Sequence, residues 1–220
     1  GMPEVGIGFF PDVGGTWLLS RAPGEIGTYF GLTGQTMNGA DAVYSGFADF
    51  YVPSAKWPDL RTALTALPAS AGAAQVAGLI RSFAEKPEPA IAQQHRQQID
   101  ALFGHDTIED IVAALRADRS DFAQATLEAL AGKSPTSLKV ALKLLRQART
   151  ATSLQECLVR EYRAALQVFE SDDFIEGVRA AIIDKDRQPK WQPSLVEDVT
   201  PQIVARYFAD RGSDELVFPN

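Results

Sequence analysis

Helix-start and helix-stop signals recur over most of this 220-residue chain, and they constrain its possible folds more than any other feature. The clearest stretch begins at Ser134-Pro135, a pair that suits the N-cap and first turn of a helix. Leu138, Leu142 and Leu145 then recur at the i, i+4, i+7 spacing of one helix face. We therefore predict a helix that ends near Arg149, within a chain that is mainly helical.

Similar patterns predict further helices between short loops. Ser153 and Glu156 stand three residues apart, as in a capping box, before an apolar-periodic stretch. Asn38 or Gly39 can cap a shorter helix nearer the start. Together these signals predict helices over residues 40–45, 54–67, 70–85, 90–103, 107–117, 120–131, 153–169, 174–185 and 201–208.

The first part of the chain is less regular and predicts a short α/β segment. Residues 5–10 favour an extended stretch, and residues 47–52 alternate weakly before a proline, as a short strand would. Residues 15–33 favour one broken helix or two short ones. We therefore expect a division into residues 1–53, with α/β character, and residues 54–220, which are helical.

Two carboxylates bracket a glycine-rich loop near the start: Glu4 in Met-Pro-Glu, and Asp12 in Phe-Pro-Asp-Val-Gly-Gly. Two acids held together in different surroundings can acquire different pKa values, so one can act as base or nucleophile and the other as acid or water-positioning group. Gly14-Gly15 lets the backbone approach a ligand, and a helix opening at Thr16 would leave free N–H groups at its start. The competing interpretation from the residues alone is a turn with two solvated acids.

Charge and composition narrow the classes of partner. The net charge is −7 and no basic stripe is present, so we expect neither nucleic-acid binding nor binding to an anionic membrane. No apolar run reaches the roughly 18 residues of a membrane-spanning helix. Hydrophobic residues make up 45% of the chain, which is typical of globular proteins. Without a signal segment at the start, a cytoplasmic location is the default expectation.

The cysteine and the histidines carry little chemistry. Cys157 is the only cysteine, so no internal disulfide can form, and its helical surroundings predict a buried small side chain. His95 and His105 are isolated from each other, so we expect both at the surface and no metal site.

The opening segment resembles the crotonase (enoyl-CoA hydratase/isomerase) superfamily, whose members process acyl-CoA thioesters. The matching pieces are Met2-Pro3-Glu4, the loop from Phe10 to Gly15, Gly24-x-x-Gly27, Leu32-Thr33-Gly34, and Ala40-Asp41-Ala42 ahead of Gly46. Residues 134–147 and 173–191 resemble the 3-hydroxyisobutyryl-CoA hydrolase group in particular. The resemblance follows the whole chain in order, and it implies the C-terminal part of an α/β crotonase-like fold.

This resemblance implies roles for both acids. In the superfamily the Glu of the Pro-Glu motif faces the thioester, so Glu4 is expected to be a general base or nucleophile. Ordinary hydratases usually carry glycine after the loop proline, whereas the hydrolase group carries an Asp that helps hydrolyse the thioester. Asp12 therefore favours a hydrolase. No separate cofactor is implied, because coenzyme A enters as part of the acyl-CoA substrate.

Five further residues are weaker candidates for contacting the substrate: Gly14, Gly15, Arg21, Arg179 and Lys185. The two glycines would act through their backbone, and Arg21 could orient a carboxylate. Arg179 and Lys185 could meet the phosphates of coenzyme A, because a late helix that reaches coenzyme A is a habit of the superfamily. Solvated surface charges are the competing interpretation for the three cations.

The resemblance also implies that the earlier part of the superfamily fold, with its glycine-rich oxyanion-hole segment, is missing from this sequence. Losing one oxyanion donor costs about 10²–10³ in rate, so we expect the isolated chain to be nearly inactive. Apolar surface left by the missing part would promote a homo-oligomer or docking to a separate N-terminal half. Three functions stay open: part of a thioester hydrolase, part of an enoyl-CoA hydratase or isomerase, or a non-catalytic helical association module.

Overall fold

The computed structural model describes residues 1–219, which form helices and loops without a strand. The chain divides into two compact units: Gly1–Thr36 together with the chain from Arg96 onward, and Met37–His95. The boundary expected after residue 53 falls inside the second unit. Among the described residues, no helix has both the length and the apolar character needed to cross a membrane.

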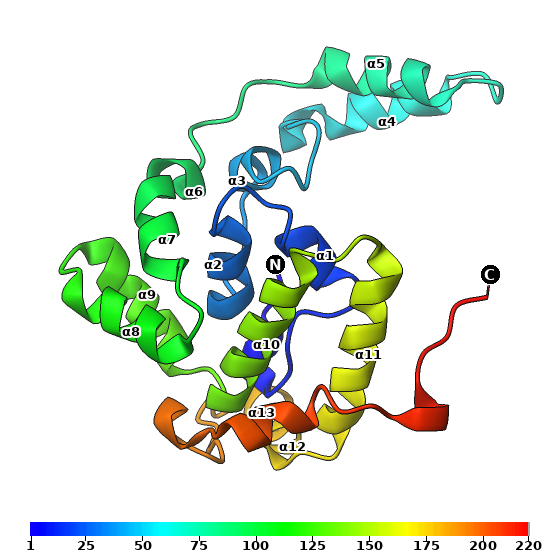
Figure 1. Cartoon of the computed structure of the whole chain (residues 1–220). Coiled ribbons are helices and arrows are strands. Elements are labelled where there is room, and N and C mark those ends of the chain that lie inside the picture. The colour runs from blue at the N-terminus through cyan, green and yellow to red at the C-terminus, as the bar shows by residue number, and fades with distance from the viewer. Residues whose placement is uncertain (220) are drawn as a thin grey trace. The chain divides into compact units, whose positions relative to one another are not determined.

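The first unit is a set of helices packed around one long helix near its centre. Its α-helices are α1 (Gly15–Leu19), α2 (Ile26–Thr33), α7 (Arg96–Phe103), α8 (Ile108–Ala117), α9 (Asp121–Ala131), α10 (Pro135–Ala148), α11 (Leu154–Phe169), α12 (Asp172–Val178) and α13 (Pro201–Arg206). Its shorter turns are η1 (Glu4–Ile7), η3 (Arg179–Ile183), η4 (Val196–Asp198) and η5 (Gly212–Asp214). Helix α10 contacts α1, α2, α8, α11 and α13 (Figure 1).

Helix α10 forms as its sequence predicts. The Ser134 side chain accepts a hydrogen bond from the N–H of Ser137 and caps the first turn. Leu138, Leu142 and Leu145 are all buried, which confirms the predicted core stripe. Full burial of one such side chain contributes about 1.5–3 kcal/mol, so this stripe is a main source of the first unit's stability.

The region from Gly15 to Thr33 contains two helices rather than one, because the chain turns between α1 and α2 at Pro23-Gly24. This confirms one of the two forms expected from the sequence. Helix α11 also forms as predicted, with the side chain of Ser153 accepting from the N–H of Glu156. The capping box there is incomplete, since the Glu156 carboxylate accepts from the Thr152 hydroxyl instead.

Both predicted extended segments are wrong. Residues 5–10 begin with the 3₁₀ turn η1, which ends at Gly8 in the left-handed region with φ 76°. Residues 47–52 form bends and irregular backbone. A strand needs a neighbouring strand to bond its backbone, and none of residues 1–219 supplies one. The α/β character expected near the start is therefore absent from the described residues, while the mainly helical prediction is confirmed.

The second unit consists of short helices and connecting loops. They are α3 (Gly39–Tyr44), η2 (Ser54–Lys56), α4 (Trp57–Thr65), α5 (Ala73–Phe83) and α6 (Ile91–Gln94). Asn38 caps α3, and a full capping box forms because the Asp41 side chain accepts from the Asn38 N–H. Asp41 is buried and also accepts from the N–H of Ala92 at 2.9 Å, which ties α3 to α6.

Two glycines let α12 rest directly on the backbone that follows Glu4. A Cβ on Gly8 would lie 2.4 Å from the carbonyl oxygen of Asp173. A Cβ on Gly177 would lie 2.3 Å from the carbonyl carbon and oxygen of Ile7. Real Cβ atoms do not approach backbone this closely, so only glycine allows this contact. The C-terminal block around α12 therefore supports the segment that carries Glu4.

We expect the substitution Gly177→Ala to lower the free energy of unfolding by about 1–3 kcal/mol, because the added methyl group overpacks the contact with Ile7. Urea denaturation followed by circular dichroism measures this change. Gly78→Ala is the matched control, since Gly78 lies inside α5 with nothing within 4 Å of its Cβ position. The control should be neutral or stabilising by up to about 1 kcal/mol. Equal effects of the two substitutions would contradict the contact.

Candidate active site

Glu4 opens the turn η1 and presents a partly buried carboxyl group. Its Oε2 atom is buried and has no hydrogen-bond partner among the described residues. Burial raises the pKa of Glu4 above its ordinary value, and the negative charge of Asp12 raises it further. A carboxyl group that has a raised pKa and an oxygen without a hydrogen-bond partner is suited to proton transfer.

Asp12 lies in the loop between Pro11 and α1, and burial raises the pKa of its carboxyl group too. Val13, which is 82% exposed, has φ 49°, and Gly14 has φ 83°. A β-branched residue in the left-handed region is rare and strained, and such strain concentrates at functional sites. The loop is therefore held in a conformation that its own sequence does not favour.

A third carboxylate, that of Glu161 on α11, binds the backbone of this loop and of the start of α1. Glu161 is 2% exposed. Its Oε2 accepts from the N–H of Gly14 at 2.7 Å, and its Oε1 accepts from the N–H of Thr16 at 3.0 Å and from the Thr16 hydroxyl. Burial raises the pKa of Glu161, these hydrogen bonds oppose that effect, and the charge of Asp12 adds to it.

Glu161 was not among the predicted site residues, although the sequence contains a signal for it. Cys157, Glu161, Ala164 and Val168 recur at i, i+4, i+7 and i+11, and all four are buried on one face of α11. A glutamate within an apolar stripe must find hydrogen-bond donors elsewhere in the fold. Cys157 itself is buried, as predicted.

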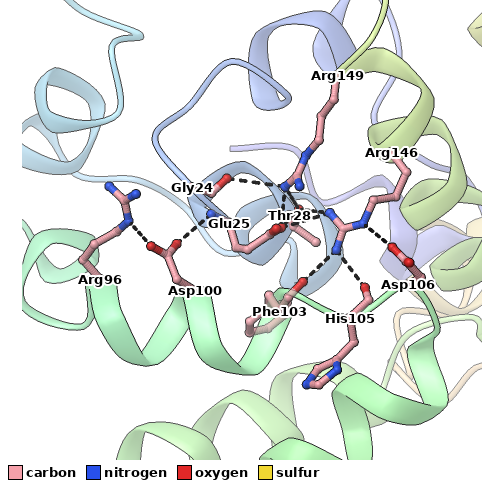
Figure 2. A network of polar contacts seen from close by, with 10 residues as sticks. All are labelled: Gly24, Glu25, Thr28, Arg96, Asp100, Phe103, His105, Asp106, Arg146 and Arg149. Carbon is pink, nitrogen blue, oxygen red and sulfur yellow. Dashed lines mark hydrogen bonds and ion pairs between the residues drawn. The ribbon is translucent and has the colours of Figure 1, made fainter.

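A polar network fixes α2, and with it the α1–α2 pair, against α7 and α10 (Figure 2). Glu25, the residue before α2, accepts from Arg146 at 2.9 Å, from Thr28 at 2.7 Å and from Arg149. Arg146 also donates to the carbonyl oxygens of Phe103 and His105, each at 2.7 Å. The network draws together residues more than 100 positions apart in the sequence, and it supports the site without lining it.

The backbone N–H groups of Gly14 and Gly15, which were predicted to contact the substrate, donate to acceptors within the protein. The N–H of Gly14 donates to Glu161, and the N–H of Gly15 donates to the carbonyl oxygen of Asp12 at 2.7 Å. These backbone donors are therefore already used, contrary to the expectation of free N–H groups at the start of this helix. Contacts of the two glycines with substrate stay predictions, and they would have to use other backbone atoms.

The predicted cations lie in other surroundings. The Arg21 guanidinium stacks on Trp17 at 3.0 Å from the ring centroid and donates to the carbonyl oxygen of Ala151 at 3.0 Å. It thus ties α1 to the chain that follows α10. A role for Arg21 in orienting a carboxylate stays a prediction.

Arg179 forms ion pairs with three carboxylates, those of Glu176, Asp184 and Asp186, at 2.7–2.8 Å. Lys185 is exposed, with φ 58°. Because three acids surround the guanidinium of Arg179, a phosphate could reach it only by displacing one of them. A contact of Arg179 or Lys185 with coenzyme A stays a prediction.

The family model described as enoyl-CoA hydratase/isomerase matches residues 1–208. The mitochondrial 3-hydroxyisobutyryl-CoA hydrolase of Xenopus tropicalis is 40% identical over 219 residues, which cover 98% of this chain and 57% of the relative. The corresponding hydrolase of Mus musculus is 41% identical over 222 residues, covering 99% of this chain and 57% of the relative. The chain therefore spans little more than half the length of these curated relatives.

Two solved structures resemble this fold. A carnitinyl-CoA dehydratase from Mycobacterium thermoresistibile has a TM-score of 0.89 and 40% identity, and the match covers 99% of this chain and 60% of that one. An enoyl-CoA hydratase from Rhodobacter sphaeroides 2.4.1 has a TM-score of 0.83 and 42% identity, with 99% and 61% covered. Both identities are high enough for the likeness to extend beyond the general fold.

Proposed function

The chain belongs to the enoyl-CoA hydratase/isomerase family, and we propose that it is the part of an acyl-CoA thioester hydrolase that carries the catalytic acids. The observation that carries this proposal is the buried, unpaired Oε2 of Glu4, whose pKa is raised by burial and by the charge of Asp12. The names of the 3-hydroxyisobutyryl-CoA hydrolase relatives support a substrate of that type.

In the proposed reaction, Asp12 positions a water molecule and Glu4 removes its proton as the water oxygen attacks the thioester carbonyl carbon. The tetrahedral intermediate then collapses, the carbon–sulfur bond breaks, and protonated Glu4 returns the proton to the sulfur of coenzyme A. Alternatively, the Glu4 carboxylate attacks the carbonyl carbon itself, and the carbon–sulfur bond breaks to expel the thiolate of coenzyme A. Water then hydrolyses the resulting anhydride, and a proton from that water passes to the thiolate. Both routes need Glu4 ionised at the start, while Asp12 differs in its contribution to each.

The activity of the isolated chain is expected to be low. The reaction needs donors aimed at the developing oxyanion, and each such donor contributes about 10²–10³ in rate. In the Asp12 loop, the N–H groups of Gly14, Gly15 and Thr16 already bond to acceptors within the protein. The oxyanion donors would therefore come from outside this loop.

A fusion tests the proposal: this chain joined to the part of the Mus musculus hydrolase that it does not match. Release of coenzyme A from 3-hydroxyisobutyryl-CoA, followed by thiol trapping, should be fast for the fusion and near background for the chain alone. A folded fusion that releases no coenzyme A would contradict the hydrolase assignment. Enzyme-like turnover by the chain alone would contradict only its expected inactivity.

A second candidate is hydration of an enoyl-CoA, favoured by the names of the two similar solved structures. The same fusion discriminates between the two reactions. Loss of the ultraviolet absorbance of an enoyl-CoA, without release of coenzyme A, would support the hydratase. Asp12 is the reason that we rank thioester hydrolysis ahead of enoyl-CoA hydration.

A third candidate is an association module, favoured by exposed apolar side chains on consecutive elements. Phe169, Ile175 and Ile183 are 63%, 66% and 69% exposed. The partner would be a second copy of this chain or a separate N-terminal half. Size-exclusion chromatography with mass measurement separates a monomer from a homo-oligomer, and adding the unmatched part of the Mus musculus hydrolase tests docking.

A further inference from the structure

Glu161 is buried without a cation to neutralise it. No ion pair joins it to a Lys, Arg or His side chain among the described residues. Its three hydrogen bonds all come from the segment directly after Asp12. Burying a carboxylate in this way is costly, because no opposite charge from the described residues compensates it. This arrangement stabilises one local conformation at the expense of a buried charge.

That local conformation is the strained one. Val13 and Gly14 both have positive φ, and Gly14 is one of the two residues whose N–H groups Glu161 binds. Two oxygens of one carboxylate, bound to N–H groups two residues apart, fix both the position and the direction of the turn. Helix α11 is 16 residues long and packs on α1 and α10, so it offers a rigid support for that clamp.

We propose that Glu161 is a positioning residue for the site, whose buried carboxylate clamps the Asp12 loop through Gly14 and Thr16 and so fixes Asp12 beside Glu4. This inference rests on the proposed function for its consequence in catalysis, but its geometry is independent of the substrate. Glu161 does not touch the reacting atoms. It acts through Asp12.

The electrostatic pattern supports this order of action. The charge of Asp12 raises the pKa of both Glu4 and Glu161, so Asp12 is the shared neighbour of the other two. Glu161 is not among the groups that shift the pKa of Glu4. A change at Glu161 is therefore expected to reach Glu4 through movement of Asp12.

A double-mutant cycle read by carboxyl ¹³C NMR titration tests the proposal on the full chain. The Glu4 signal is assigned from its absence in Glu4→Gln. Glu161→Gln should lower the pKa of Glu4, in the same direction as Asp12→Asn, because the released loop carries the Asp12 charge away. In the Asp12→Asn background, Glu161→Gln should leave the pKa of Glu4 unchanged.

Two further variants serve as a control and as a milder change at the same contact. Glu170→Gln makes the same substitution in an exposed residue just after α11 and should leave the pKa of Glu4 unchanged. Thr16→Val removes one of the three hydrogen bonds to Glu161 and should lower the pKa of Glu4 by less than Glu161→Gln does. It also replaces Glu161→Gln if circular dichroism shows that the latter does not fold.

The proposal is overturned if the pKa of Glu4 stays constant in folded Glu161→Gln or Thr16→Val, or if it shifts equally with and without Asp12. Because the titration needs no turnover, an inactive fusion would reject the proposed function and leave this inference standing. An active fusion with an unchanged Glu4 titration would reject the inference alone. In an active fusion, Glu161→Gln should lower kcat more than it changes KM.

Discussion

Replacing Arg146 by methionine is expected to lower the free energy of unfolding by about 3–5 kcal/mol, because it removes one of the two arginines that pair with the buried Glu25 carboxylate, together with a donor to two carbonyl oxygens. The Arg146 side chain is 18% exposed and that of Glu25 is 11% exposed. Besides Glu25, the substitution leaves the carbonyl oxygens of Phe103 and His105 without this donor (Figure 2). Methionine retains much of the apolar packing of the arginine stem, so the change isolates the polar contacts.

The matched control is Arg149→Met, one helical turn later. Arg149 also donates to Glu25, but its side chain is 34% exposed and most of its contacts are shared with Arg146. Its loss should therefore destabilise the protein less than the loss of Arg146. Urea denaturation at neutral pH measures both variants. Equal losses would show that the bonds to Phe103 and His105 contribute nothing beyond the shared ion pair.

The loss of unfolding free energy in Arg146→Met should also depend on pH, and the pKa of Glu25 gives its direction. Burial alone would raise the pKa of Glu25, but the hydrogen bonds from Arg149 and Thr28 and the charges of Arg146 and Arg149 outweigh burial and lower it. A lowered folded-state pKa stabilises the fold above the ordinary value of 4.5, and this stabilisation is lost as pH falls through the folded-state pKa. The gap between the wild-type chain and Arg146→Met should therefore narrow below pH 4.5. A gap that widens in acid would contradict this assignment.

Replacing Glu4 by glutamine in the active fusion is expected to reduce release of coenzyme A by about 10²–10⁴-fold, which is the usual contribution of a general acid–base group. Glutamine keeps the shape of the side chain but cannot take up a proton. Because Oε2 of Glu4 makes no hydrogen bond to the described residues, the loss should fall on turnover rather than on stability. Glu128→Gln, an exposed change on α9, is the control and should retain full activity.

The pH profile adds a second measurement on Asp12. Glu4 must be ionised to act as a base, so activity should fall in acid through the pKa of Glu4. The Asp12 charge raises that pKa, and Asp12→Asn should therefore move the acid limb of the profile to lower pH while reducing the rate. A limb that moves to higher pH would show that Asp12 does not act on Glu4 through its charge.

Predictions that depend on neighbours in the sequence were the reliable ones. Ser134 caps α10 and Ser153 caps α11, because each side chain bonds an N–H group three residues later. Leu138 and Leu142 are buried because a helix brings residues four apart onto one face. These interactions need no information from distant parts of the chain.

The extended segments failed for the opposite reason. Residues 47–52 alternate weakly, but alternation describes only one side of a strand pair, and no partner strand exists in residues 1–219. Residues 5–7 lie in a 3₁₀ turn, and Gly8, which caps that turn, lies against the backbone of Asp173. That contact spans most of the chain and could not be inferred from the local pattern.

The sequence by itself determined that the chain is mainly helical and, through its resemblance, that Glu4 and Asp12 are the candidate acids. Only the tertiary structure decided that Glu161, 147 residues from Gly14, holds the segment directly after Asp12. It also decided that the loop N–H groups are already occupied. The physical reason is that helices form from interactions within a few residues, whereas a buried carboxylate is compensated by whichever donors the complete fold brings to it.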